Sequence, residues 1–186
     1  MEFTPHAPNM TYTELPYPVF DSDFHFYETA DAFTRYLPEQ YQGLVRMANI
    51  DGRNKMIVRG RVSDYIPNPT FEVVAEPGSG FEYFSGRNTE GKSFREIVTT
   101  MRTTPTFTDP DARLSLMDRM HIDAQVNFPT LASLIEVNFM DDPEASQVLI
   151  HAFNQWIYDE WGFDHAGRIF TTPVMNLWTA EGAVRE

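Results

Sequence analysis

The chain of 186 residues contains no cysteine. Disulfide bonds, thiolate metal ligands and a cysteine nucleophile are therefore excluded, and any bound metal must be held by nitrogen and oxygen ligands. Basic residues are also few, because 14 Lys and Arg stand against 27 Asp and Glu and give a net charge of −13 at pH 7. Since binding to nucleic-acid phosphates needs clustered Lys and Arg, we expect no nucleic-acid partner.

Long apolar runs and a secretory leader are missing as well. No run approaches the roughly 18 consecutive apolar residues of a membrane helix, and no basic segment followed by an apolar one opens the chain. We therefore expect a cytoplasmic protein with no membrane partner. The hydrophobic fraction of 42% is enough for a substantial core in one domain.

Apolar periodicity and turn residues predict alternating strands and helices. Residues 1–18 carry several prolines and no periodic pattern, which predicts an N-terminal arm. The pairs Asp109-Pro110 and Asp142-Pro143 each combine a capping acid with a proline in the first turn, and so predict helix starts. Strands are predicted at 19–24, 123–128 and 168–174, and helices at 29–37, 39–47, 93–101, 110–120, 143–161 and 179–186.

Residues 50–87 depart from this pattern. The dipeptide Asp51-Gly52 before an alternating run at 55–59 predicts a β-hairpin. Residues 64–87 are dense in Pro and Gly and show little periodicity. Loops of that length in a compact domain usually form a lid or an oligomer contact, or are mobile. We interpret 50–87 as a hairpin and loop insertion.

Three strands separated by helices predict right-handed crossovers and a parallel sheet, which defines an α/β fold. A parallel sheet is normally buried on both faces and continued by further strands. The last predicted helix stops within its second turn, with no closing strand after it. We therefore expect residues 1–186 to form a single incomplete domain, the opening part of a longer one.

One short stretch, Asp-Ser-Asp-Phe-His-Phe-Tyr-Glu at 21–28, has the residue types of a metal site. In a regular strand alternate side chains share a face, so Asp21, Asp23 and His25 would project together. A carboxylate and an imidazole side by side can supply half of a metal site. The ordinary alternative is a turn followed by a packed or solvated histidine, and strand spacing does not decide between the two.

This stretch and four later blocks resemble a known family. The blocks lie, in the same order as in the family, at 109–113, 117–124, 128–130 and 152–156. Together they resemble the N-terminal part of the amidohydrolase-related family of metal-dependent hydrolases, which also includes the aromatic and aminocarboxymuconate decarboxylases. The resemblance implies about three βα units of a (β/α)₈ TIM-type barrel, with the active site at the C-terminal ends of the strands.

In that family the first strand supplies two metal ligands, and matched residue by residue these fall on Asp23 and His25. The resemblance therefore implies a divalent metal ion, Zn²⁺, Mn²⁺ or Mg²⁺, with less selectivity because an aspartate replaces a histidine. The family's later histidine and aspartate ligands have no counterpart, and no catalytic residue is assigned. Asp21 is expected to have a structural role, and Glu28 to begin a helix near the site.

The other polar residues of interest are interpreted structurally. His151 is expected to pack on the flank of the long helix, and His121 to lie in a helix-to-strand turn. His165 precedes a strand, at the end opposite the active face of a barrel, and His6 in the arm is uninformative. Asn154 is expected to tie down a loop.

Three functional hypotheses follow. The first is a metal-dependent hydrolase of a small aromatic or carboxylate-bearing compound, with a non-oxidative decarboxylase of the same family as its alternative. The second is a truncated chain that is inactive alone, because two ligands do not complete a metal shell. The third is a small α/β binding module that holds a partner with residues 64–87. A homo-oligomer of the full-length protein is left open.

Overall fold

A computed structural model describes residues 12–65, 67–76, 78–88 and 90–186. Most of the predicted N-terminal arm, with His6, lies outside these residues. The chain divides into two compact units, each described by itself below. The first unit runs to Thr70 and resumes at Thr104, and the second comprises residues 71–103.

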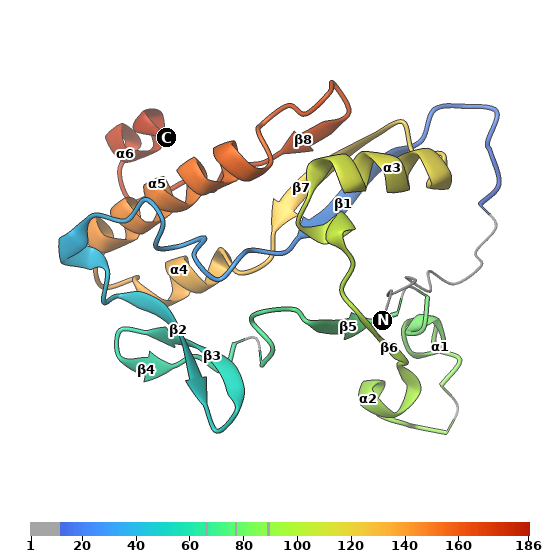
Figure 1. The fold of residues 1–186 in the computed structure, drawn as a ribbon, viewed down its shortest axis with the longest axis horizontal. Coiled ribbons are helices and arrows are strands. Elements are labelled where there is room, and N and C mark those ends of the chain that lie inside the picture. Colours follow the sequence, from blue (N-terminus) through green and yellow to red (C-terminus); the bar gives the residue numbers. More distant parts are fainter. Residues whose placement is uncertain (1–11, 66, 77, 89) are drawn as a thin grey trace, which may run out of the picture. The chain divides into compact units, whose positions relative to one another are not determined.

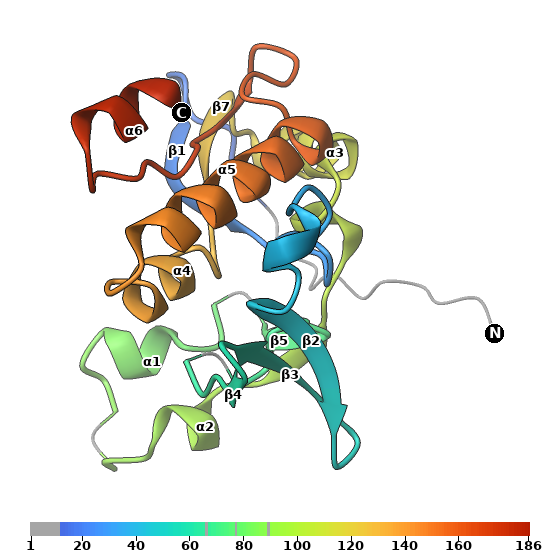
Figure 2. The ribbon, with the colours of Figure 1, turned by 90° about the vertical axis from the view of Figure 1, so that its left-hand side faces the viewer.

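The first unit is built on a parallel sheet of three strands. These strands are β1 (Phe20–Phe26), β7 (Ala124–Pro129) and β8 (Ile169–Thr171), in the order β1-β7-β8. Figures 1 and 2 show the helices α3 (Pro110–Met120) and α5 (Pro143–Glu160) running beside this sheet. The predicted α/β pattern with a parallel sheet is thereby confirmed, while the continuation into a full barrel stays a prediction.

Aromatic side chains join β1 to α5. The ring of Phe26 lies 5.9 Å from that of Trp156 and 5.3 Å from that of Trp161, and all three residues are buried. Phe33 stacks on Phe153 with a ring separation of 4.7 Å. Because each such ring removes roughly 150–250 Å² from water, this cluster holds the helix layer on one face of the sheet.

The two Asp-Pro helix starts are confirmed. The Asp109 carboxylate accepts hydrogen bonds from the backbone N–H groups of Asp111 and Ala112, at 2.9 and 3.1 Å. Asp142 caps α5 in the same way. At the other end of α3, His121 takes a left-handed conformation with φ 56° and turns the chain toward β7, as expected for a helix-to-strand turn.

Two predicted helices in the first unit are wrong. Residues 39–47 form a short 3₁₀ turn, η1 (Glu39–Tyr41), followed by the strand β2 (Val45–Ile50). The strand forms because Asp51 and Gly52 both adopt the positive φ of a tight hairpin turn, which pairs β2 with β3 (Arg53–Val58). The predicted hairpin is therefore present, but it begins five residues earlier than expected, and β4 (Arg61–Val62) extends it.

The other wrong helix is 29–37, which forms consecutive turns. The Ala32 and Leu37 amides donate to carbonyls three residues back, while the Arg35 amide donates to Asp31 four residues back and forms one isolated α-helical turn. Local side-chain bonds compete with helix formation, since the Thr29 hydroxyl donates to the Asp31 carboxylate at 2.6 Å.

The second unit contains the strands β5 (Val73–Ala75) and β6 (Thr100–Arg102) and the short helices α1 (Phe81–Phe84) and α2 (Phe94–Ile97). The helix predicted at 93–101 is thus correct only in its first half. Ser93 caps it through the Glu96 carboxylate, but Val98 is already extended because the following residues pair with β5.

The first unit is completed by three short elements, η2 (Pro105–Phe107), α4 (Ser133–Asn138) and α6 (Ala180–Arg185). In the part of the chain that the structure describes, no helix is long and apolar enough to cross a membrane.

Candidate metal-binding site

A β-bulge in β1 decides which acids face the site. Asp21 lies opposite Gln125 and Phe24 opposite Asn127, so three steps along β1 match two steps along β7. The Asp21 carboxylate accepts the N–H of Asp23 at 3.1 Å, which satisfies an amide that the bulge removes from regular pairing. The extra residue breaks the alternation of side chains, so Asp21 and Asp23 point to opposite faces.

Asp21 faces the helix layer, where it meets Arg113 of α3. The Arg113 guanidinium lies 3.4 Å from the Asp21 carboxylate, donates to Gln125 at 2.7 Å and stacks 3.6 Å above the Phe24 ring. Burial lowers the pKa of Arg113 to about 10. Asp21 is therefore structural, as expected, but the prediction that it projects together with Asp23 and His25 is wrong because of the bulge.

Asp23 and His25 lie together on the other face, at the C-terminal end of β1. Their side chains are 83% and 49% exposed, and Asp23 Oδ1 lies 3.4 Å from His25 Nε2. His25 Nδ1 lies 3.1 Å from the carbonyl oxygen of Pro129, at the end of β7. Since a carbonyl oxygen only accepts hydrogen bonds, Nδ1 donates its proton to Pro129, and this leaves Nε2 directed toward Asp23.

This arrangement fits two ligands of one metal ion. Nε2 and the Asp23 carboxylate face each other across 3.4 Å, and a proton or a cation between them would stabilise this approach. Donors bound at about 2.0–2.2 Å to a tetrahedral ion are themselves separated by about 3.3–3.6 Å. Metal-bound histidines commonly donate their other ring N–H to a backbone carbonyl, as Nδ1 does here. Among the described residues, however, no group of three His, Asp or Glu side chains could hold a metal.

The other histidine–acid pairs have a different geometry. His165 Nε2 lies 2.9 Å from Asp111 Oδ1, and His151 Nδ1 lies 3.1 Å from the Glu186 carboxylate. Both distances are those of direct hydrogen bonds. His165 precedes β8, as predicted. His151 was predicted to pack, and this is wrong: its side chain is 58% exposed, because position 151 lies beside the apolar stripe of α5 and faces α6.

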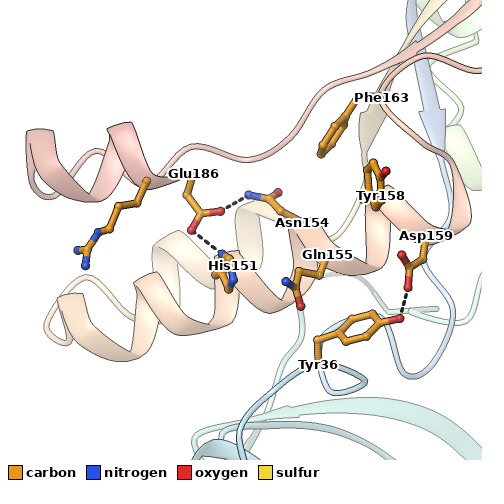
Figure 3. A pocket seen from close by; sticks show the side chains of 9 residues that line it. Tyr36, His151, Asn154, Gln155, Tyr158, Asp159, Phe163 and Glu186 are labelled. Atoms are coloured by element: carbon orange, nitrogen blue, oxygen red, sulfur yellow. Dashed lines mark hydrogen bonds and ion pairs between the residues drawn. The ribbon is translucent and has the colours of Figure 1, made fainter.

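A cavity of about 440 Å³ lies beside this second pair, and Figure 3 shows the side chains that line it. Asn154 exchanges two hydrogen bonds with the backbone of Val174, at 2.8 and 2.9 Å, and so ties down a loop as predicted. Its amide also donates to the Glu186 carboxylate, which His151 contacts as well. His151, Asn154 and Glu186 therefore bind one another directly, unlike the pair on β1.

Glu28, two residues beyond β1, is 3% exposed. Its Oε1 accepts the backbone N–H groups of Thr130 and Leu131 at 2.9 and 2.7 Å. Burial raises the pKa of Glu28 to about 7, and it outweighs the backbone hydrogen bonds that lower it. The prediction that Glu28 begins a helix is wrong, since turns follow it. Sequence reasoning missed its burial because no local pattern marks a buried acid.

Among known proteins, no family model and no curated protein matches this chain. Among solved structures, it is similar to the amidohydrolase map2389c from Mycobacterium avium subsp. paratuberculosis K-10, with a TM-score of 0.84 and 33% identity over 92% of this chain. The chain has an amidohydrolase-like fold. It covers 45% of the length of that amidohydrolase, so it spans about half of the similar protein.

Proposed function

We propose that this chain supplies the first-strand ligands, Asp23 and His25, of a metal-dependent hydrolase of the amidohydrolase type. One observation carries the proposal. His25 Nε2 lies 3.4 Å from the Asp23 carboxylate, while Nδ1 is held by the Pro129 carbonyl. The similarity to an amidohydrolase supports a hydrolase, and in this chain the pair lies on its first strand, β1.

When bound, a divalent ion would lower the pKa of a water molecule or polarise a substrate oxygen. His25 would contribute a neutral nitrogen, and Asp23 a negative charge that partly balances the cation. The further ligands that a closed shell needs would come from groups other than the described residues. The substrate class, a small aromatic or carboxylate-bearing compound, rests on the resemblance of the sequence blocks.

The test is metal binding by the chelator-treated chain, titrated in turn with Zn²⁺, Mn²⁺ and Mg²⁺ and followed by calorimetry. We expect weak binding of at least one ion, because two ligands leave the shell incomplete. D23N and H25N should each lower the affinity at least about tenfold, since each removes one ligand.

The matched controls are D111N and H165N, which break a histidine–acid pair that already forms a direct hydrogen bond. They should change the affinity less than twofold. Equal losses in the controls, or no loss in D23N and H25N, would contradict the proposal. Metal-dependent release of a hydrolysis product from aryl amides or esters would support the hydrolase, and release of carbon dioxide from aryl carboxylates would support the decarboxylase instead.

A further inference from the structure

Glu28 is a buried acid whose hydrogen bonds hold the backbone after β7 in place. Moving a carboxylate out of water costs several kcal/mol unless its charge or its oxygens are compensated. Oε1 is compensated by the N–H groups of Thr130 and Leu131, but no described residue forms a hydrogen bond with Oε2. The two hydrogen bonds of Oε1 therefore fix the turn that follows β7.

That turn is also held by the end of β1. The Thr130 hydroxyl donates to the carbonyl of Phe26 at 2.7 Å, and the Pro129 carbonyl accepts from His25 Nδ1 at 3.1 Å. This turn is therefore held at several points by β1 and by the residues just after it.

One peptide plane links Glu28 to His25. The carbonyl of Pro129 and the N–H of Thr130 belong to the same rigid, trans peptide unit and point in opposite directions. His25 binds the carbonyl end of this unit, and Glu28 binds its N–H end. Rotation of the plane would break both hydrogen bonds together, so Glu28 controls the direction in which the Pro129 carbonyl points.

We propose that Glu28 is a positioning residue for His25. By holding the peptide between Pro129 and Thr130, it fixes the acceptor of Nδ1–H, and this keeps Nε2 directed at Asp23. Where it concerns metal affinity, the inference rests on the proposed function, but the tautomer of His25 can be measured in the metal-free protein.

The first measurement is the tautomer of His25 by ¹⁵N NMR in the metal-free chain. We expect protonation at Nδ1 in the unsubstituted chain and in E28Q, because a glutamine oxygen can accept the same two N–H groups. In E28A the Nδ1 preference should be lost, with a substantial population of the Nε2–H form. An unchanged tautomer in folded E28A would overturn the proposal.

The second measurement is Zn²⁺ affinity by calorimetry. E28A should bind Zn²⁺ about 10–100-fold more weakly, the usual effect of removing a group that orients a ligand, and E28Q should stay within about threefold of the unsubstituted chain. The matched control is N154A, which also removes two backbone hydrogen bonds made by a buried side chain. It should lose stability but keep both the His25 tautomer and the affinity.

The two proposals can fail separately. If the unsubstituted chain binds no metal while E28A changes the tautomer, the proposed function fails and the positioning role stands. If the chain binds Zn²⁺ and E28A changes neither quantity, the positioning role fails and the proposed function stands. If E28A does not fold, E28D replaces it: its carboxylate is one methylene too short to reach both N–H groups, and it must reproduce the loss of the Nδ1 tautomer.

Discussion

Replacing Glu28 by glutamine should change how the stability of the protein depends on pH. Burial raises the pKa of this carboxyl from the ordinary 4.5 to about 7. The native state therefore binds the proton more tightly than the unfolded chain. The stability that this protonation contributes is fully present below pH 4.5, and it is lost as the pH rises through 7.

The rise in the pKa of Glu28 from 4.5 to about 7 corresponds to about 3 kcal/mol of unfolding free energy. Most of this contribution is lost between pH 5 and pH 8. The glutamine of E28Q is neutral at every pH, so E28Q lacks this pH-dependent contribution to the free energy of unfolding. The free energy of unfolding of the unsubstituted protein, measured relative to that of E28Q, should therefore fall as the pH rises across this range.

Urea unfolding at several pH values, followed by tryptophan fluorescence, measures this difference. The three tryptophans all lie in the compact unit that contains Glu28. The control is E39Q, which removes an exposed acid and tests for the loss of one negative charge from a chain of net charge −13. Parallel pH curves for the unsubstituted protein and E28Q, or a difference that grows in the opposite direction, would refute the reasoning.

Three further substitutions test the fold around the site. D21N should lower the free energy of unfolding by about 1–2 kcal/mol, because it removes the charge that faces buried Arg113. It should leave the Zn²⁺ affinity unchanged, and a loss of affinity in calorimetry would contradict the placement of Asp21 by the bulge. D109A should cost about 1 kcal/mol in urea unfolding through the lost helix cap, and an unchanged midpoint would argue against it. I157A should cost about 2–5 kcal/mol because this side chain is fully buried, whereas V137A, which truncates an exposed side chain, should stay within about 0.5 kcal/mol.

The sequence predicts the parts of the fold that local chemistry determines. The Asp109 and Asp142 caps are visible because a capping acid, a proline and an apolar stripe follow one another within a few residues. Strand β7 is visible because its residues are apolar at alternate positions from Ala124 and the run ends at Pro129. The order of the sequence blocks also led to the amidohydrolase-like fold, which the structural comparison supports.

The remaining features depend on contacts between distant residues. Residues 45–47 have no local preference strong enough to oppose pairing with β3, so strand pairing overrides the predicted helix. The bulge of β1 exists only relative to β7, and a single strand read by itself shows strict alternation. The burial of Glu28 likewise depends on Thr130 and Leu131, which lie about a hundred residues further along the chain.

The bulge also determines where β1 can change its length. In most of a strand, deleting one residue turns every following side chain to the opposite face. Between Asp21 and Phe24, β1 has one residue more than the matching part of β7. A protein lacking Ser22 would regain regular alternation, with Asp21 still beside Arg113 and with Asp23 and His25 still together on the other face. Natural length variation in this strand is therefore expected at position 22.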